Sequence, residues 1–427
     1  MKVLIHSHFP AGHTYPMQAV AQALILQGHT VTWLTSADNE LRALATGANF
    51  IPTKAIAALD QPLLKSNTTG LFESPSRILR NRLLAQVADY RDALADFPAD
   101  VLLVDVFPHG ARALYELGEI PVYATLGVIP MYTSSLGAPL PASGGVPPVS
   151  WTGWLINAMR QVINRCWVGM LFLRPGINVQ RRELGLPDLP IGEALEDFKY
   201  SPHLHIQASS LKLELNQQPG TAAHQTNTVY VGPLVTKTIH DPSKLPSWWN
   251  ELPSKGKIIG ITQGTLAMDP TSLIIPSIKA LQEDADLTIL VISPFVEAIQ
   301  SHVAHSQNIH YAKWLPYDVL LPRLSLLITN GGYGSITQAL SHGVPLLCAG
   351  QSEDKRDTAA RVTFSGVGID LRTDSPEVDV VRDAAYRILR DEGYGVRARK
   401  LGDELNDLGG ADAAVRALEE LFRHVKS

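Results

Sequence analysis

Residues 326–340 read LLITNGGYGSITQAL, and this segment decides the fold expected of the chain. An apolar run ends at Asn330, three glycines follow within four positions, and a helical pattern begins at about Ser335. A strand, a glycine-rich turn and a helix in this order form the repeating unit of parallel α/β sheets. Glycine lets the backbone approach a ligand, and a helix N-terminus offers N–H groups and partial positive charge. The segment therefore predicts an anion site whose natural guest is a diphosphate.

Two other interpretations of this turn compete with an anion site. A tight connection between a strand and a helix could use glycine without any ligand, although such a turn seldom needs three glycines. A dinucleotide-binding fingerprint opens the first strand of a domain and has an acidic ribose ligand about twenty residues later. The turn comes late in its half of the chain and its glycine spacing differs, so the fingerprint is the weaker match.

The alternation of strand and helix patterns extends outward over the whole chain. KVLIHSHF (2–9), a helical pattern over 17–25 and HTVTWLT (29–35) form a first β-α-β unit, and the rhythm restarts at KIIGITQGT (257–265). Between them, the stretch NQQPGTAAHQTN has the composition of a linker. We predict an α/β protein of two facing Rossmann-like α/β/α domains with a cleft between them. Its expected parts are an N-terminal domain over 1–215, a linker over 216–229, a C-terminal domain over 230–408, and a helix over 409–427 that packs back on the first domain.

The composition excludes several classes of protein. With 36 basic and 41 acidic residues the formal charge is −5, which provides no basic field for a phosphate backbone, so no nucleic-acid partner is expected. Two cysteines, Cys166 and Cys348, cannot build a disulfide framework or a four-thiolate metal site. We interpret both as core residues of a protein in a reducing compartment.

No stretch of the sequence is long and apolar enough to suggest a membrane span. The nearest candidate, residues 154–173, is interrupted by Arg160 and Arg165 and has the pattern of an amphipathic helix. We therefore expect a cytoplasmic protein, and the amphipathic helix leaves open a peripheral contact with a membrane surface.

Two polar residues after strands of the N-terminal half indicate acid–base chemistry. His13 lies between the first strand and the first helix, and Asp105 ends the apolar strand ADVLLVDVF. Ligands of parallel sheets bind beyond the carboxyl ends of the strands, so both side chains are expected at the same edge. Histidine titrates near neutrality and can remove a hydroxyl proton, and a carboxylate beside it would orient the ring. A lone loop histidine is more often structural, but the pairing with Asp105 favours catalysis.

Two turns of the C-terminal half carry further polar groups. Gly264 and Thr265, in GITQGT, end the first strand of that half and could add an N–H and a hydroxyl to the diphosphate site. Asp354 and Lys355, in GQSEDK, follow another strand and could hold hydroxyl groups of a polar ligand. Taken alone, either turn could equally be a solvated loop.

Metal-binding patterns are weak in this sequence. His6 and His8 share a strand face, and His203 and His205 repeat that spacing. Neither pair has a third ligand nearby in sequence, so we interpret all four as structural and expect no metal. The acidic tripeptide DAD at 284–286 precedes a strand rather than following one, and we assign it no metal either.

The motifs together resemble the family 1 nucleotide-sugar glycosyltransferases of GT-B fold, which include macrolide, phenolic, sterol and lipid glycosyltransferases. ITQGT at 261, TNGGYG at 329, HGVPL at 342 and EDK at 353 are similar to strings of the fungal and bacterial members, and the resemblance covers nearly the whole chain. The resemblance implies transfer of a hexose from a UDP-sugar, with glucose as the expected hexose. It also implies that the reaction needs no metal. The implied acceptor is small and apolar: a lipid or hydroxy fatty acid, a phenolic compound or a polyketide. The choice between UDP and dTDP stays open.

The resemblance also implies a role for each matching residue. His13 corresponds to the catalytic base of the family and Asp105 to the acid that orients it. Trp314, in KWLP, corresponds to the tryptophan that stacks on the uracil of the donor. The other positions that match donor-binding residues are Gly264, Thr265, Asn330, Gly331, Gly332, Gly334, Ser335, Gln338, Asp354 and Lys355.

Three positions depart from the common family pattern. Asn330 stands where many relatives have histidine, so an amide donor replaces a potential cation at the diphosphate. Lys355 replaces a glutamine that usually meets the sugar, which leaves the identity of the sugar open, and Tyr317 replaces another glutamine. We interpret these changes as specialisation because they recur together in the fungal and bacterial members.

The residues and the resemblance fit a single displacement. His13 removes the hydroxyl proton of the acceptor as the oxygen attacks the anomeric carbon and inverts it, while N–H groups at the helix of Ser335 stabilise the departing diphosphate. The residues expected to line the acceptor site are Phe9, Met131, Tyr132, Trp151 and Trp154. Any one of these could instead belong to the core.

Two other functions remain open at this point. A nucleotide-sugar epimerase could use the same two-domain cleft, but would not need the apolar segment at 131–175. A non-catalytic sugar-nucleotide-binding accessory protein could keep the fold, but would be expected to lose His13 or Asp105, and both are present.

Overall fold

The computed structural model describes most of the chain, and the described residues form two compact units. Unit 1 comprises Met1–Pro141, Pro147–Thr236 and Leu408–Ser427, and unit 2 comprises Ala142–Val146 and Lys237–Asp407. Residues 216–226 of the expected linker lie outside the described residues. The described ranges are 1–64, 81–133, 135–193, 195–215, 227–236, 245–253, 255–264 and 269–426.

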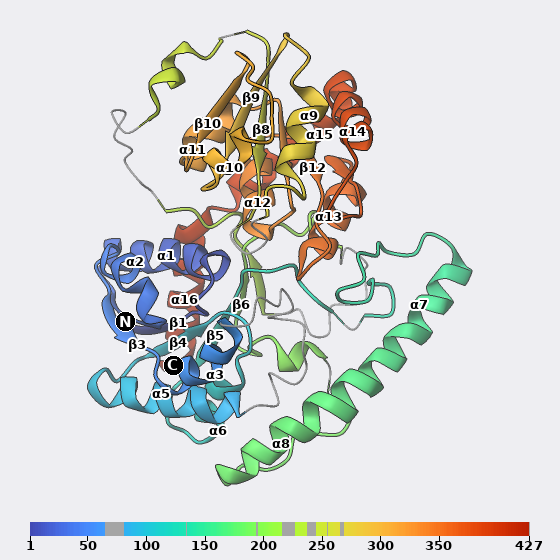
Figure 1. Ribbon diagram of the computed structural model, residues 1–427. Helices are drawn as coiled ribbons and strands as arrows, with labels where there is room; N and C mark the ends of the chain where they lie inside the picture. Colours follow the sequence, from blue (N-terminus) through green and yellow to red (C-terminus); the bar gives the residue numbers. More distant parts are fainter. Residues whose placement is uncertain are drawn as a thin grey trace. The chain divides into compact units, whose positions relative to one another are not determined.

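Unit 1 is built on a parallel sheet (Figure 1). Its strands are β1 (Lys2–His6), β2 (Thr30–Thr35), β3 (Asn49–Pro52), β4 (Val101–Val104), β5 (Tyr123–Gly127), β6 (His205–Gln207) and β7 (Thr228–Tyr230), in the spatial order β3-β2-β1-β4-β5-β6-β7. β1 is an almost continuous apolar run because both faces of this central strand are covered. His6 pairs with Leu34 of β2 and with Val104 of β4, so the carboxyl ends of β1 and β4 lie side by side.

Helices connect and follow the strands of this sheet. They are α1 (Ala11–Leu26), α2 (Glu40–Leu44), α3 (Ala55–Leu64), α5 (Arg82–Asp96), α6 (His109–Glu116), α7 (Trp151–Asn164), α8 (Arg174–Glu183) and α16 (Gly410–Lys426), with 3-10 turns η1 (Ala37–Asn39) and η3 (Leu195–Phe198). Ile5 of β1 is buried in one cluster with Leu24 of α1 and Leu418 of α16. Leu4, which points the other way, is buried with residues of α5 and α6. The last helix of the chain therefore completes the core of unit 1.

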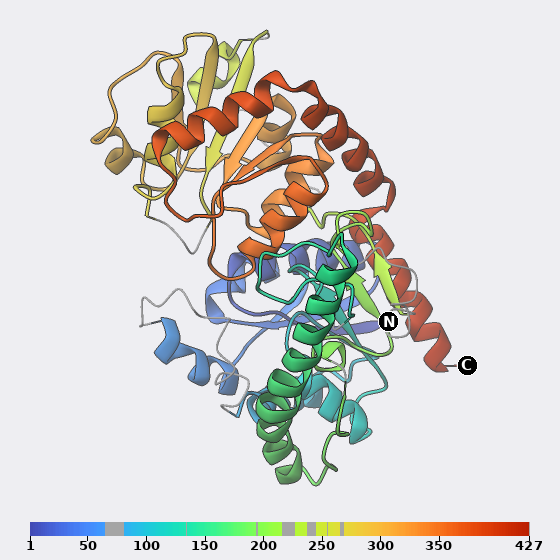
Figure 2. The ribbon, with the colours of Figure 1, turned by 90° about the vertical axis from the view of Figure 1, so that its right-hand side faces the viewer.

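One long helix of unit 1 runs from Trp151 to Glu183. α7 passes directly into the π-helix η2 (Arg165–Leu173) and then into α8, and the three continue as a single helix in both views (Figures 1 and 2). Ser150 caps its start, because its Oγ accepts a hydrogen bond of 3.1 Å from the Gly153 N–H. Many large apolar side chains of this helix are turned to solvent. No helix in the described ranges is long and apolar enough to cross a membrane.

Unit 2 contains a second parallel sheet (Figure 1). Its strands are β8 (Lys257–Thr262), β9 (Leu287–Ile292), β10 (Ile309–Ala312), β11 (Leu326–Thr329), β12 (Leu346–Cys348) and β13 (Gly368–Asp370), in the order β10-β9-β8-β11-β12-β13. Its helices are α9 (Ile274–Leu281), α10 (Val296–Gln300), α11 (Tyr317–Leu320), α12 (Tyr333–Ser341), α13 (Lys355–Phe364), α14 (Val378–Arg390) and α15 (Glu392–Asp407), with 3-10 turns η6 (Ser247–Glu251) and η7 (Leu321–Arg323). Ile259 of β8 packs with α9 and α14, and Ile258 packs with Trp249 on the other face. Two parallel α/β sheets confirm the predicted fold class.

The two cysteines differ in their surroundings. Cys348 is buried in β12, and burial raises the pKa of its thiol, as expected of a core residue. Cys166 is exposed on η2, so the interpretation of this residue as part of the core is wrong. The reason is that η2 buries Gly169 and Leu173 and turns the side of Cys166 to solvent.

Three buried histidines make the stability of unit 1 sensitive to acid. Burial lowers the pKa of His6 and of His109 to about 3, and that of His205 to about 4. In the unfolded chain each would titrate near 6.5, so below that pH the unfolded state binds more protons than the folded state. We expect the free energy of unfolding to fall from about pH 6.5 to about pH 4, by up to ~1.4 kcal/mol per pH unit for each histidine.

Urea unfolding at about pH 7 and about pH 5 measures this dependence. His205→Gln should reduce the slope, because one linked proton is removed. His302→Gln removes a histidine that is exposed and serves as the control, with an unchanged slope. Equal slopes in both variants would contradict the assignment.

Candidate functional site

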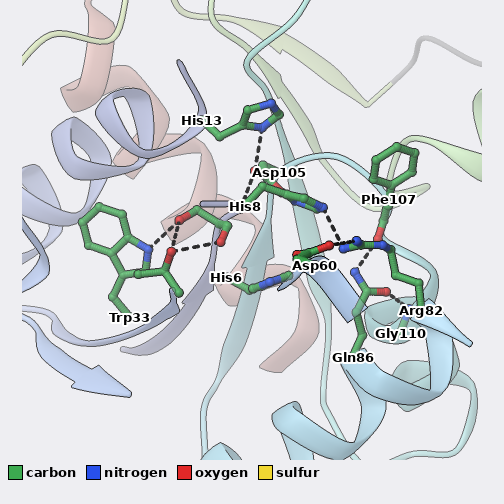
Figure 3. Close-up of polar contacts among 12 residues, drawn as sticks. His6, His8, His13, Trp33, Asp60, Arg82, Gln86, Asp105, Phe107 and Gly110 are labelled. Atoms are coloured by element: carbon green, nitrogen blue, oxygen red, sulfur yellow. Dashed lines mark hydrogen bonds and ion pairs between the residues drawn. The ribbon is translucent and has the colours of Figure 1, made fainter. Parts of the chain in front are cut away.

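The structure brings His13 and Asp105 together at the carboxyl edge of the sheet of unit 1. Asp105 follows β4, and His13 lies in the first turn of α1, which follows β1. His13 Nδ1 is 2.9 Å from Asp105 Oδ2, and the second ring nitrogen points away from the carboxylate (Figure 3). Both side chains are buried, with Asp105 only 1% exposed. The adjacency of the ends of β1 and β4 produces this contact between residues 92 positions apart.

Asp105 also accepts hydrogen bonds from His8. The backbone N–H of His8 donates to Oδ2 and the His8 ring nitrogen Nδ1 lies 2.9 Å from Oδ1. Burial alone would raise the pKa of the Asp105 carboxyl, but the contacts with His8 and His13 outweigh burial and hold the pKa well below its usual range. An ionised carboxylate can only accept, so Nδ1 of His13 must carry a proton. In the neutral ring, Nε2 then holds the lone pair that can take up a second proton.

His8 was interpreted as structural, and its contact with Asp105 was not predicted from the sequence. For His6 a structural role fits, because Tyr90 Oη lies 2.7 Å from His6 Nδ1 and burial keeps this ring neutral. His8 lies two residues beyond β1 and reaches the acid that follows the neighbouring strand. The signal available in the sequence was that the ends of adjacent parallel strands meet, but the order of the strands was needed to use it.

His8, His13 and Asp105 also satisfy the spacing of a metal site. One ligand atom from each lies within 4.8 Å of the others, so the fold supplies the third group that was not found near His8 in sequence. However, Arg82 Nη1 lies 3.2 Å from His8 Nε2, and a guanidinium can only donate. Nε2 must therefore accept, which leaves the proton on Nδ1. That proton occupies the position facing Asp105, so the observed arrangement is a hydrogen-bond network.

In unit 2 the glycine-rich turn joins β11 to α12. Gly331 has φ +87°, a left-handed conformation that favours glycine, and Gly332 is the N-cap of α12, which starts two residues before the expected Ser335. A Cβ added at Gly332 would meet nothing within 4 Å, and one at Gly334 only Gln338 Nε2 at 4.0 Å. A tight turn therefore explains one glycine of the three. The open space at the other two favours a backbone that receives a ligand.

The amide of Asn330 lies beside Gly264 at the start of this turn. Asn330 is 4% exposed, and within the described part of the chain its Nδ2 has no hydrogen-bond partner. A Cβ at Gly264 would come within 2.9 Å of Nδ2, so glycine at the end of β8 leaves room beside the amide. A buried donor without a partner is rare in proteins and indicates a missing acceptor. Thr265, predicted to act with Gly264, lies outside the described residues.

The start of α12 is suited to negative charge. The helix has no side-chain cap and no acidic residue in its first turn, so the positive end of its dipole is not neutralised locally. Ser335 Oγ lies 3.4 Å from Tyr317 Oη of α11, and Gln338 Nε2 donates to the Gly334 carbonyl at 3.1 Å. Trp314, after β10, is 66% exposed and presents an aromatic surface at the same edge of the sheet.

The turn before α13 differs from the expectation for Lys355. Asp354 is half-buried at the N-cap position of α13. Lys355 is 4% exposed, and its ammonium pairs with Glu353 at 2.6 Å and donates to Ser352 Oγ at 3.0 Å. The structure thus uses the Lys355 charge to neutralise Glu353 within the turn, whereas the sequence analysis expected it to meet a sugar.

The five residues expected to line an acceptor site are dispersed over unit 1. Phe9 is half-buried between β1 and α1. Met131 is buried and its N–H donates to Glu214, while the Tyr132 ring lies under the Lys199 ammonium. Trp151 and Trp154, in the first turn of α7, are 77% and 41% exposed.

Comparison with known proteins identifies relatives over the whole chain. Residues 279–421 match the family described as "Erythromycin biosynthesis protein CIII-like, C-terminal domain". The chain is 32% identical to the "4'-demethylrebeccamycin synthase" of Lentzea aerocolonigenes, covering 98% of both proteins. It is 34% identical to the "UDP-glucosyltransferase avaP" of Aspergillus versicolor, covering 98% of this chain and 96% of that protein.

Solved structures show the same fold. The calicheamicin glycosyltransferase CalG4 superposes with a TM-score of 0.75 over 100% of this chain and 99% of its own, at 20% sequence identity. At that identity the likeness establishes the arrangement of strands and helices and nothing about the ligands.

The different reasons for glycine at positions 331 and 334 can be separated by substitution. Gly331→Ala should destabilise unit 2 by about 1–2 kcal/mol, because alanine resists a left-handed backbone. Gly334→Ala places its Cβ in open space within a helix, so the free energy of unfolding should stay constant or rise by up to ~1 kcal/mol. Urea unfolding of the two variants checks this, and a similar loss of stability in both would mean that packing dictates both glycines.

Proposed function

The chain belongs to the family 1 glycosyltransferases of GT-B fold, and from this premise we propose that it moves glucose from UDP-glucose to a hydroxyl of a small apolar acceptor with inversion at the anomeric carbon. The observation that carries the mechanism is the 2.9 Å contact between His13 Nδ1 and the ionised Asp105 carboxylate. The choice of UDP-glucose rests on relatives such as the "UDP-glucosyltransferase B1" of Starmerella bombicola.

In the proposed reaction His13 is the base. Its Nε2 takes the proton of the acceptor hydroxyl while that oxygen forms a bond to the anomeric carbon and the bond from this carbon to the UDP oxygen breaks. Asp105 remains ionised, keeps the proton of His13 on Nδ1 and stabilises the imidazolium as it forms. One displacement of this kind inverts the anomeric configuration.

The leaving diphosphate would be held by unit 2. The uncapped start of α12 and the buried Asn330 amide are donors fixed before the reaction, so they can stabilise charge as it develops on the diphosphate. Trp314 supplies a stacking surface for the base of the nucleotide. Because these donors are neutral or dipolar groups of the protein, we propose that no metal is needed and that transfer continues in EDTA.

The proposed acceptor is a polyketide or phenolic natural product or a hydroxylated lipid. The relative in Lentzea aerocolonigenes is named for rebeccamycin, and the apolar side chains at the start of α7 agree with an apolar acceptor. A non-catalytic accessory protein would need no oriented base, so the hydrogen-bonded His13–Asp105 pair favours an enzyme. An epimerase would need no acceptor, so the relatives named as glucosyltransferases favour transfer.

We also propose a peripheral membrane contact through the long helix. Trp151, Leu155, Met159, Ile163, Trp167 and Leu171 recur every four residues, and each is 48–77% exposed. The sequence from 120 to 182 contains no acidic residue, while Arg160 is exposed on α7. An apolar row next to basic charge suits a helix lying in the surface of an anionic membrane, where an apolar acceptor would also collect.

His13 and Trp314 should affect separate steps. His13→Ala should lower kcat by at least about 10²-fold while UDP affinity stays constant, because only proton removal is lost. Trp314→Ala should weaken UDP binding by about 1–3 kcal/mol, the range measured for stacking of a base on an aromatic ring. Calorimetry with UDP in EDTA and a transfer assay with UDP-glucose measure both variants, and each is the control of the other. Undiminished transfer by His13→Ala would refute the assignment of the base.

The membrane contact is tested with vesicles. The protein should sediment with vesicles of phosphatidylcholine and phosphatidylglycerol and less with phosphatidylcholine alone. Met159→Gln combined with Ile163→Gln should reduce binding by roughly tenfold or more, given the apolar area removed. Leu41→Gln changes a side chain that is 83% exposed on α2 and is the matched control. Unchanged sedimentation of the double variant would exclude this face.

A further inference from the structure

A buried chain of polar contacts extends from the His13–Asp105 pair into the interior of unit 1. Asp60 of α3 pairs with Arg82 at the start of α5, and Arg82 Nη1 lies 3.2 Å from His8 Nε2. His8 in turn contacts both carboxylate oxygens of Asp105 (Figure 3). Asp60, Arg82 and His8 are each at most 6% exposed, so none of these contacts is a surface ion pair.

Arg82 and Asp105 together fix the protonation of His8. The Asp105 carboxylate can only accept, so His8 Nδ1 carries a proton and donates to Oδ1. A guanidinium has donors only, so His8 Nε2 must present its lone pair to Arg82, and the ring is neutral. Without Arg82, Nε2 could take up a second proton and the ring would become a cation beside Asp105.

His8 fixes the orientation of the Asp105 carboxylate. Its ring donates to Oδ1 and its backbone N–H donates to Oδ2, at 2.9 Å each, so rotation of the carboxylate would break two hydrogen bonds. Oδ2 is thereby held where the Nδ1–H of His13 donates. The position of the His13 ring depends on a carboxylate that His8 holds in place.

The helices that carry Asp60 and Arg82 are themselves anchored. Asp89 of α5 accepts the backbone N–H groups of Lys54, Ala55 and Ile56 at the start of α3, which fixes α3 against α5. Gln180 of α8 accepts the Leu83 N–H at 2.9 Å at the start of α5. These side chains supply the acceptors that the two helix starts lack, so Asp60 and Arg82 meet in one geometry.

Contacts on the other side of His8 complete its surroundings. Phe107 has φ +60°, and its ring lies 5.6 Å from the His8 ring. Gln86 of α5 holds this turn, because its Nε2 donates to the Phe107 carbonyl at 2.8 Å and its Oε1 accepts the Gly110 N–H at 3.0 Å (Figure 3). α5 thus supports His8 through both Arg82 and the turn at Phe107.

We propose that Arg82 and His8 are positioning residues of the transfer reaction: Asp60 orients Arg82, Arg82 keeps His8 neutral, and His8 holds Asp105 so that His13 Nε2 faces the acceptor hydroxyl. The role in catalysis rests on the proposed function of His13. The protonation of His8 does not rest on that function, so the catalytic role and the protonation of His8 can be refuted separately. A buried ion pair that only supports the fold would have no effect on the orientation or basicity of His13.

The first experiment reads the tautomer directly. In the full-length protein labelled with ¹⁵N-histidine, His8 should show a protonated Nδ1 and an unprotonated Nε2, and His13 a protonated Nδ1, with His8→Leu and His13→Ala used to assign the signals. An Nε2-protonated or doubly protonated His8 would overturn the proposal, whatever the activity of the enzyme.

The second experiment reads the consequence for catalysis. His8→Leu should lower kcat by about 10- to 100-fold with little change in KM, the size expected for a misplaced catalytic group. The acid limb of its pH profile should move to higher pH, because a carboxylate with fewer donors stabilises the His13 imidazolium more. His8→Asn keeps a donor near the position of Nδ1 and should recover most of the rate.

Arg82→Met combined with Asp60→Asn removes the buried pair without leaving one charge alone. It should move the acid limb to lower pH, opposite to His8→Leu, because His8 can then become a cation and lower the proton affinity of His13. The matched control is Arg181→Met, which breaks the ion pair between α8 and Glu116 of α6 in the same unit, away from Asp105. It should lose stability but keep the wild-type pH profile. If the control shifts the profile equally, or if His8→Leu keeps the wild-type kcat and profile, the positioning role is refuted. If His13→Ala retains transfer, the proposed function fails while the tautomer result stands.

Discussion

A negative charge buried at the edge of the sheet of unit 1 is the constraint on which the site depends. Removing a carboxylate from water costs several kcal/mol unless donors replace the water. Asp105 follows a fully buried strand, so its donors must come from the neighbouring chain segment. The residues after β1 supply them, with His8 giving two and His13 one. The same requirement explains why a second charged pair, Arg82 with Asp60, lies buried behind His8.

Unit 2 provides the opposite electrostatic character through neutral and dipolar donors. The positive end of α12 and the Asn330 amide offer donors, and the Lys355 charge is already neutralised by Glu353. The candidate base thus lies in one unit and the candidate anion site in the other. This division fits a reaction in which a proton is removed from one substrate while negative charge develops on the leaving group of another.

Local patterns were sufficient to predict most of the architecture and part of the site. The strand, glycine turn and helix at 326–340 are present as predicted, because glycine conformation and helical periodicity act over a few residues. The pairing of His13 with Asp105 was also accessible, since a charge at the end of an apolar strand requires a partner. The exposure of single side chains was less predictable. Cys166 lies in an apolar stretch and is nevertheless exposed. Periodicity shows that a helix has an apolar face, but it does not show which part of the protein covers that face.

The sequence by itself determined two α/β units, the glycine-rich turn after a strand, and the choice of His13 and Asp105 as a candidate pair, because each follows from residue types within a short window. Only the tertiary structure decided that His8 contacts Asp105 and that Arg82 and Asp60 stand behind it. Their contacts join residues 97, 74 and 22 positions apart along the chain. The order β1-β4 and the capping of α3 and α5 create these contacts, and both depend on packing across the whole unit. The lone pair on His8 Nε2 is therefore a property of the fold, since it is required by a donor that no local pattern places beside it.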